Sequence, residues 1–217
     1  GTFTTLAGCV TPSGLTATAT SYNTATLSWT GLSTVPTSGY QYYYSTSSTA
    51  PSSVATPSGS TMTTSASLTG LAGGTTYYVW VRSNCGSPLG ISSWSPMVEF
   101  TTPLENDEAP GAISITLDGT SDCLGTFTNV TGTVSTGEPF PSCIGTDGYG
   151  IVWFKFTAPS SGHVKITNDF TVSGSTVMGD SKIGLFDITD PSDYSTFTII
   201  ACDDDNGVVS AGKSILY

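Results

Sequence analysis

Short runs of β-branched and aromatic residues recur along the chain at intervals of about ten residues, and Gly, Pro, Ser and Asn turns separate them. Almost no stretch has the spacing of apolar residues that an α-helix needs. With 217 residues, the chain is long enough for two domains of about 100 residues each. This pattern predicts an all-β protein made of two β-sandwiches in tandem.

The charged residues lie almost entirely in the second half of the chain. Residues 1–103 contain one basic residue, Arg82, and one acidic residue, Glu99, whereas residues 104–217 carry the whole net charge of −11. A surface so acidic repels nucleic acid and anionic membranes, and divalent cations are its natural partners. No apolar run approaches the roughly 18 residues of a membrane-spanning helix. We therefore expect neither nucleic-acid binding nor membrane insertion.

The boundary between the two domains is expected at residues 101–108 (Thr-Thr-Pro-Leu-Glu-Asn-Asp-Glu), where a strand-like run ends and acidic residues begin. Residues 2–5 (Thr-Phe-Thr-Thr) are similar to residues 99–102 (Glu-Phe-Thr-Thr), the last run of the first domain. We therefore interpret residues 1–7 as a linker or as the tail of a preceding repeat. A Thr-rich leader strand is the alternative.

Residues 8–103 contain three motifs that belong together. Residues 27–29 (Leu-Ser-Trp) supply the buried Trp of an early strand, and residues 40–44 (Tyr-Gln-Tyr-Tyr-Tyr) supply a central strand. Residues 71–81 contain a corner in which the ring of Tyr77 enters the core while its hydroxyl needs a backbone partner across the turn. With these motifs, the segment resembles a fibronectin type III domain.

The resemblance also implies a disulfide between Cys9 and Cys85, because secreted bacterial members of the family often join these two positions. A bridge across so long a loop is worth about 4 kcal/mol, and two buried free thiols are the alternative. The Cys residues are scattered singly, so a zinc site is not expected. Few Lys and abundant Ser and Thr favour a location outside the cytoplasm, and the resemblance to secreted bacterial members implies the bacterial cell surface or the medium beyond it.

Strand alternation predicts an aromatic stripe on one face of the first domain. If Tyr77 points inward, Tyr78 and Trp80 point outward, and so does Tyr43 on the central strand. The two strands that carry these residues are neighbours in fibronectin type III domains, so the three outward rings would lie together. They could stack on sugars or receive a partner protein. Ordinary aromatic pairing that stabilises the sheet is the alternative.

The second half of the chain carries its own set of motifs. They are residues 106–108 (Asn-Asp-Glu), 152–159 (Val-Trp-Phe-Lys-Phe-Thr-Ala-Pro), 182–187 (Lys-Ile-Gly-Leu-Phe-Asp) and 201–205 (Ala-Cys-Asp-Asp-Asp). With them, residues 104–217 resemble a jelly-roll module of secreted multidomain bacterial proteins, especially those of Bacteroidetes, and more distantly pre-peptidase C-terminal domains. Members of the family continue with a closing strand, so the sandwich is expected to be incomplete at its C-terminus.

The second domain contains three Cys residues. Cys123 and Cys143 flank a Thr- and Gly-rich stretch, and we predict a disulfide between them, worth about 3 kcal/mol. Cys202 would then be a buried small side chain or the partner of a residue beyond Tyr217. Pairing of Cys123 or Cys143 with Cys202 is the alternative.

Three consecutive aspartates, beginning at Asp203, follow a strand-like run and precede an Asn-Gly turn. The mutual repulsion of their carboxylates destabilises the folded chain unless a bound cation or water reduces it. Extended backbone projects Asp203 and Asp205 to one side, and the jelly-roll family often carries an Asp at the position of Asp180. We therefore predict a calcium site, with a solvated acidic turn as the alternative. Its ligands are Asp180, Asp203 and Asp205, with Asn206 and Asp187 in reserve.

The sequence contains no recognisable catalytic set. The single His, His163, lies in a turn without a nucleophile motif nearby, so a surface position is the simpler interpretation. The clustered aspartates lie on one turn, which suits a metal better than two opposed catalytic carboxylates. Neither a phosphate-binding loop nor a dinucleotide fingerprint occurs. We expect that these residues are not an enzyme.

Three functions fit this organisation. The leading hypothesis is a non-catalytic structural or adhesive segment of a large secreted or cell-surface bacterial protein, which spaces other domains of that protein and contacts glycans or surface proteins. The alternative is an accessory region of a secreted hydrolase that binds carbohydrate or assists a peptidase. The third is a subunit of an extracellular surface filament.

Overall fold

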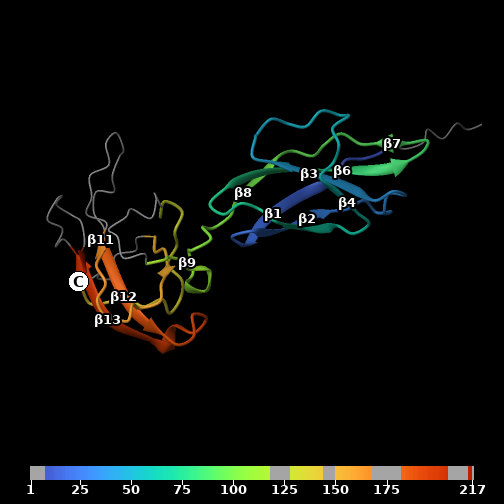
Figure 1. The fold of residues 1–217 in the computed structure, drawn as a ribbon. Coiled ribbons are helices and arrows are strands. Elements are labelled where there is room, and N and C mark those ends of the chain that lie inside the picture. Colours follow the sequence, from blue (N-terminus) through green and yellow to red (C-terminus); the bar gives the residue numbers. More distant parts are fainter. Residues whose placement is uncertain (1–7, 118–127, 144–149, 168–181, 205–214, 217) are drawn as a thin grey trace, which may run out of the picture. The chain divides into compact units, whose positions relative to one another are not determined.

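The computed structural model describes residues 8–117, 128–143, 150–167, 182–204 and 215–216. The chain divides into two compact units, Gly1–Glu105 and Asn106–Tyr217 (Figure 1). Both consist of β-strands, and the described residues contain two short 3-10 helices but no α-helix. The expected all-β fold class is therefore confirmed. Within the same residues, no helix is long and apolar enough to cross a membrane.

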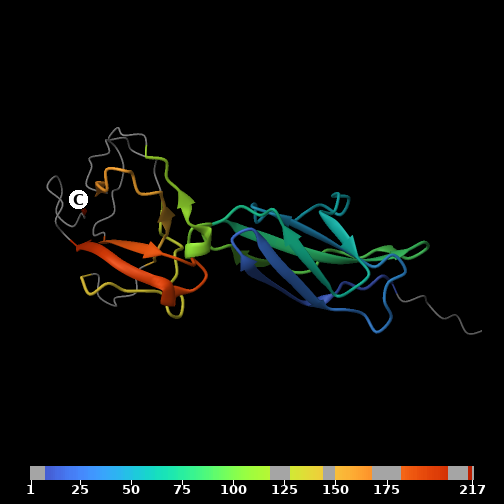
Figure 2. The same cartoon turned by 60° about the horizontal axis from the view of Figure 1, so that its bottom comes forward.

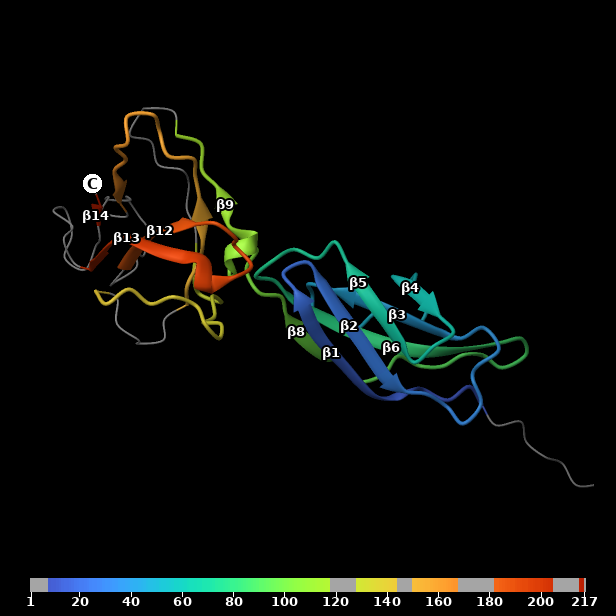
Figure 3. The ribbon, with the colours of Figure 1, turned by 90° about the horizontal axis from the view of Figure 1, so that it is seen from below.

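The first unit is a sandwich of two antiparallel sheets (Figure 2, Figure 3). One sheet has the strand order β1-β2-β5, with bounds β1 (Ser13–Ser21), β2 (Thr24–Thr30) and β5 (Ser65–Thr69). The other has the order β4-β3-β6, and both β7 and β8 pair with β6. Its strands are β3 (Tyr40–Ser45), β4 (Gly59–Thr61), β6 (Thr76–Gly86), β7 (Gly90–Ile91) and β8 (Val98–Thr101).

Strict alternation of side chains builds the core of this sandwich. In β2, Ala25, Leu27 and Trp29 are buried and the residues between them are exposed, as a strand with one covered face requires. Buried side chains from both sheets form one cluster, and each large one stabilises the fold by about 1.5–3 kcal/mol. The members are Leu15, Ala25, Leu27, Trp29, Tyr40, Leu68, Leu71, Tyr77, Val79, Val81 and Phe100.

The corner at Tyr77 forms as the sequence predicts. The Tyr77 ring is 8% exposed and stacks on Phe100 with ring centroids 5.7 Å apart. The backbone N–H of Ala72 donates a hydrogen bond to the Tyr77 hydroxyl oxygen at 2.8 Å. The hydroxyl therefore ties the turn before β6 to the core, and the ring fills the space between the sheets.

The second unit contains three two-stranded ladders among its described residues. The antiparallel hairpin of β12 (Lys182–Ile188) and β13 (Phe197–Asp204) is the longest, and a 3-10 helix, η2 (Tyr194–Thr196), lies between its strands. The remaining elements are η1 (Ala109–Gly111), β9 (Ile113–Ser114), β10 (Phe154–Lys155), β11 (Ile166–Thr167) and β14 (Ile215–Leu216). β9 pairs with β10 in parallel, and β11 pairs with β14 in antiparallel. The jelly-roll topology stays a prediction.

Trp153 is the centre of the aromatic core in this unit. It is 8% exposed, and its ring centroid lies 5.6 Å from that of Phe186 and 5.5 Å from that of Phe197. The ring of Tyr194 stacks on it at 6.3 Å. These rings come from both strands of the hairpin and from η2. Trp153 therefore packs the hairpin against the segment that leads into β10.

Candidate functional site

The predicted aromatic stripe lies on adjacent strands, but it is not open. β3 and β6 pair with Tyr43 opposite Trp80, and the two ring centroids are 6.0 Å apart. Tyr43 and Tyr78 are half-buried, whereas Trp80 is only 2% exposed. The prediction of an exposed Trp80 is therefore wrong. Alternation places its side chain on the outer face of the sheet, and other groups then cover it.

Arg82 and Trp94 belong to that cover. The Arg82 guanidinium lies over the Trp94 ring, 4.1 Å from its centroid, and its Nε donates a hydrogen bond to Gln41 Oε1 at 2.8 Å. The Trp94 ring also lies against Tyr43, with centroids 6.1 Å apart. A desolvated cation over an indole contributes up to about 2 kcal/mol, so this contact holds Trp94 against the sheet.

The loop between β3 and β4 is attached to the same two side chains. Arg82 donates hydrogen bonds to the carbonyl oxygens of Ser53 at 2.7 Å and Ala55 at 3.3 Å. Trp94 Nε1 donates to the carbonyl oxygen of Ser52 at 3.1 Å. Three backbone carbonyls of this loop are thus held by Arg82 and Trp94, on the face of the sheet where Trp80 lies.

Arg82 is an unusual buried cation because each partner named above is neutral. It is 3% exposed, and burial lowers its pKa. Its contacts are a side-chain amide, two backbone carbonyls and an indole ring. Each of the three guanidinium nitrogens thus donates a hydrogen bond to a neutral oxygen, and none of these acceptors is a carboxylate. Arg82 therefore holds the loop, and the sequence identified it only as the single basic residue of this domain.

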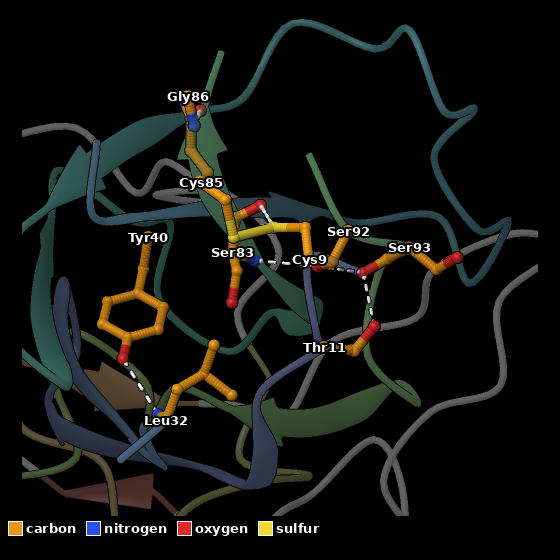
Figure 4. Close-up of a disulfide and its surroundings, with 10 residues drawn as sticks. Cys9, Thr11, Leu32, Tyr40, Ser83, Cys85, Gly86, Ser92 and Ser93 are labelled. Atoms are coloured by element: carbon orange, nitrogen blue, oxygen red, sulfur yellow. Dashed lines mark hydrogen bonds between the residues drawn. A yellow bond between two sulfur atoms is a disulfide. The ribbon is translucent and has the colours of Figure 1, made fainter. Parts of the chain in front are cut away.

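A disulfide joins Cys9 to Cys85, the pairing that the family resemblance implies (Figure 4). The two Cα atoms are 5.8 Å apart, although the residues are separated by 76 positions in the sequence. Close by, the Thr11 hydroxyl donates a hydrogen bond to the carbonyl oxygen of Ser93 at 3.1 Å. The segment before β1 is therefore fixed to the end of β6 and to the stretch that leads into β8.

The second disulfide corrects a prediction. Cys143 is joined to Cys202, not to Cys123, with Cα atoms 6.2 Å apart and a sequence separation of 59. Cys202 lies on β13 opposite Gly184, and the pairing depends on which segment folds against this strand. A disulfide requires Cα atoms within about 7 Å, which closeness along the sequence does not provide. Cys123 lies outside the described residues.

Three carboxylates, Asp107, Glu108 and Glu138, form a cluster at the start of the second unit; we call it the carboxylate cluster. Asp107 is 4% exposed, and its two oxygens accept hydrogen bonds from the backbone N–H of Thr133 at 2.6 Å and from the Thr133 hydroxyl at 2.7 Å. Glu108 accepts a hydrogen bond from the Tyr194 hydroxyl at 2.6 Å. The Asn-Asp-Glu motif that marks this module therefore connects segments far apart in the sequence.

Glu138 is the member of the carboxylate cluster that contacts the aromatic core of the second unit. It is 5% exposed, and it accepts hydrogen bonds from Trp153 Nε1 at 2.7 Å and from the backbone N–H of Ser135 at 2.9 Å. Burial raises its pKa, and the negative charges of Glu108 and Asp107 raise it further, whereas the two hydrogen bonds lower it. Because each oxygen of the Glu138 carboxylate accepts a hydrogen bond from the protein, this side chain links the backbone at Ser135 to Trp153.

Tyr194 completes this arrangement from η2. Burial raises the pKa of its hydroxyl, and the hydrogen bond to Glu108 raises it further. The hydroxyl therefore stays protonated throughout the physiological pH range and donates a hydrogen bond to the Glu108 carboxylate. The sequence missed Glu138 and Tyr194 as partners, because no spacing rule links them to residues 106–108.

The structure tests only part of the predicted calcium site. Asp203, near the end of β13, is 3% exposed and lies opposite Ile183 on β12. Asp187 is exposed on β12, four residues from Ile183. This spacing places it about 13 Å from Asp203 along the hairpin, and two carboxylates that far apart cannot bind the same ion. Asp187 therefore fails as a reserve ligand. The other predicted ligands, Asp180, Asp205 and Asn206, lie outside the described residues.

The neighbouring Asp204 has a role of its own. Its carboxylate forms a salt bridge with Lys182 at 3.1 Å, across the two strands of the hairpin. Among the described residues, no group of three His, Cys, Asp or Glu side chains is arranged to hold a metal ion. Calcium binding at Asp203 therefore stays a prediction.

Comparison with known proteins assigns a family to the first unit. Residues 10–101 match the fibronectin type III domain and are such a domain, typical of non-catalytic modules in multidomain extracellular or cell-surface proteins. No catalytic family is found, the second unit has no family assignment, and no curated protein matches the chain. The fibronectin type III domain and the two disulfides point to an extracellular protein.

Solved structures similar to the chain include three examples. One, described as a myokine structure, is 26% identical, with a TM-score of 0.35, and the match covers 44% of this chain and 99% of that one. A fibronectin type III domain of human fibronectin type III domain containing protein 3 is 21% identical, with a TM-score of 0.37. The match covers 48% of this chain and 94% of that domain. An Fn3-like protein from Clostridium thermocellum is 28% identical, with a TM-score of 0.37. The match covers 45% of this chain and 96% of that protein.

Proposed function

We propose that the fibronectin type III domain of residues 10–101 and the unit that follows it form a non-catalytic structural and adhesive segment of a large secreted or cell-surface bacterial protein. The observation that carries this proposal is the pair of long-range disulfides, one in each unit. Each closes most of its unit into a covalent loop. A segment that must keep its length under load, outside the cell, benefits from such loops.

The positions of Cys9 and Cys85 explain how the first unit would carry a load. When force is applied at its two ends, the covalent bond between these residues prevents the chain between them from extending. Only the part after Cys85, which includes β7 and β8, can unravel. The bond between Cys143 and Cys202 restricts the second unit in the same way. The spacing between neighbouring domains is thereby maintained.

Single-molecule stretching of the whole chain tests the spacer role. After reduction, the unfolding length of the first unit should increase by roughly 260 Å for its 76-residue separation, and that of the second by roughly 200 Å for its 59. The variant Cys9→Ser should release only the first increment, and Cys202→Ser only the second. If oxidised and reduced chains extend equally, the disulfides do not limit extension and the proposal fails.

The same proposal includes contacts with glycans or surface proteins, for which the outer face of β3 and β6 is the best-placed surface. Tyr43 and Tyr78 are half-buried on it, and Val54, in the loop that Arg82 holds, is 88% exposed. Rings that are partly covered and rigidly packed can bind a partner with little loss of conformational entropy.

An array of glycans and matrix proteins, probed with the whole chain, tests this contact. For any ligand that binds, Tyr78→Thr should weaken binding about tenfold, which corresponds to roughly 1.4 kcal/mol. Thr is a good strand former, so the sheet is preserved. The matched control is Thr56→Ser, which changes an exposed residue of the loop between β3 and β4 and should bind normally. Equal binding by both variants would exclude this face.

A further inference from the structure

Strand β5 forms one edge of the sheet β1-β2-β5, and its outer side pairs with no other strand of the described structure (Figure 3). The Trp29 N–H donates a hydrogen bond to the carbonyl oxygen of Thr64 at 3.0 Å, so Thr64, directly before β5, directs its backbone toward β2. Successive residues of a strand direct their N–H and C=O groups to opposite sides. Ser65, Ser67 and Thr69 therefore present theirs at the open edge.

The other edge strands of this domain have features that discourage pairing with another chain. β8 contains Glu99 and lies between Pro96 and Pro103, β4 has only three residues, and β7 has only two. The register of β1 is irregular near both of its ends. Proline, charge, short length and irregular register are means by which edge strands avoid association. β5 has five residues, neither proline nor charge, and an unbroken register against β2.

The backbone of β5 is complementary to a second copy of β5 in antiparallel pairing. When Ser67 lies opposite Ser67 of the second copy, Ser65 lies opposite Thr69 of that copy, and Thr69 lies opposite Ser65. Each of these pairs can exchange both N–H···O=C bonds. The Ser65 carbonyl already accepts a hydrogen bond from the Thr63 hydroxyl at 3.0 Å, but a carbonyl oxygen has two lone pairs. Every other register leaves at least one of the three edge residues without a partner.

The side chains of two paired β5 strands also match. On the outer face the two Ser67 hydroxyls meet, and the same sheet already contains a pair of this kind, because the hydroxyls of Thr16 and Ser28 on β1 and β2 are 2.8 Å apart. On the inner face Ala66 lies opposite Leu68 of the second copy, which extends the apolar layer of the core. Residues 1–103 have no net charge, so two such domains approach each other without net repulsion.

We propose that this domain associates with a second copy of itself through β5, so that two three-stranded sheets become one continuous sheet with a two-fold axis at Ser67. The contact is isologous, since the same surface lies on both sides of the axis. β5 offers neither a charge nor an aromatic ring to a different partner strand, whereas its small side chains match their own copies. The contact is separate from the face of β3 and β6 proposed above for glycans or surface proteins, because β5 belongs to the other sheet.

The short length of β5 limits the strength of this contact. Pairing of two five-residue strands buries less than the roughly 1,200 Å² of a stable complex. We therefore expect a dissociation constant on the order of 100 μM. When many chains are anchored on one surface, their effective concentration is high, and a contact of this strength would join neighbouring copies there.

Sedimentation equilibrium of the whole chain, from about 10 μM to about 1 mM, tests the proposal. The wild-type chain should change from monomer to dimer across this range. Ser67→Pro should weaken association by about tenfold or more, because it removes an N–H at the open edge. An edge strand tolerates proline where that N–H points away from the sheet, and unchanged circular dichroism confirms folding. The matched control Ser67→Thr keeps both the N–H and a hydroxyl and should dimerise as wild type does.

A pair of charge variants locates the two-fold axis. In Ser67→Lys and in Ser67→Glu, like charges lie directly opposite each other in the dimer, so each variant alone should associate about tenfold more weakly than wild type. An equimolar mixture should associate better than either variant alone, because unlike charges then face each other. The proposal is overturned if the wild-type chain stays monomeric at about 1 mM, or if Ser67→Pro dimerises as wild type does. A mixture that associates no better than the separate variants also overturns it.

Discussion

Replacement of Glu138 by Ala is expected to lower the unfolding free energy of the second unit by about 3 kcal/mol. The Glu138 carboxylate accepts hydrogen bonds from Trp153 Nε1 at 2.7 Å and from the backbone N–H of Ser135 at 2.9 Å. Ala leaves both donors without this acceptor. An unsatisfied buried donor costs about 1–3 kcal/mol; the cost is higher at Trp153, which is 8% exposed, than at the half-buried Ser135.

The variant Glu138→Gln separates hydrogen bonding from charge. Its amide oxygen can accept one of the two donors, but its NH2 group cannot accept the other, so we expect a smaller loss than for Ala. Burial raises the Glu138 pKa above its ordinary value of 4.5. The folded state then binds the proton more tightly than the unfolded state.

The sign of the pH dependence follows from this difference. The extra stability that proton binding gives to the wild type is fully present below 4.5, the ordinary value, and is lost as the pH rises through the raised pKa. Gln does not titrate. The deficit of Glu138→Gln relative to wild type should therefore be largest in acid and should narrow toward neutral pH.

Differential scanning calorimetry across this pH range is the assay. At neutral pH, a loss of about 3 kcal/mol should lower the melting temperature of the second unit by roughly 12 °C. Asp187→Asn, which changes an exposed carboxylate of the same unit, should stay within about 0.5 kcal/mol of wild type. The reasoning fails if Glu138→Ala melts together with Asp187→Asn, or if the deficit of Glu138→Gln widens as the pH rises.

Three further outcomes are expected. Tyr77→Phe removes the acceptor of the Ala72 N–H and should cost about 1 kcal/mol, or 4–8 °C; Tyr44→Phe, whose hydroxyl accepts no such bond in the described structure, should change the melting temperature less. Arg82→Met should speed proteolytic cleavage between β3 and β4, because the carbonyls of residues 53 and 55 lose their donor; cleavage at the wild-type rate would contradict this. Calcium at a hundred times its dissociation constant should stabilise the second unit by about 2.7 kcal/mol, and Asp203→Asn should abolish the effect; a chelator without effect on wild type would exclude the site.

Local patterns in the sequence were sufficient for the buried face of β2 and for the Tyr77 corner of the first unit. Alternation in β2 predicts that Leu27 and Trp29 are buried, and the structure confirms it. The Tyr77 corner is also local, because its hydroxyl bonds to Ala72 only five residues away. Such features depend on the strand period and on turn geometry, which nearby residues fix.

Long-range partners were not predictable in the same way. Alternation assigns Trp80 to the outer face, but it cannot show that Arg82 and Trp94 hold a loop around it. The charge of Arg82 did not indicate these contacts either, because its partners are neutral groups from distant segments. Exposure of a side chain depends on all segments that pack over it, and the strand period describes only one of them.

The sequence by itself determined the all-β class, the fibronectin type III fold of the first unit and the acidic character of the second. Each follows from residue order or composition, since side-chain alternation and net charge do not depend on which distant segments meet. The tertiary structure alone decided that Cys143 bonds to Cys202 and that Glu138 accepts Trp153 Nε1. The physical reason is that disulfides and buried hydrogen bonds act only over a few ångströms, and the packing of the whole unit decides which groups come that close.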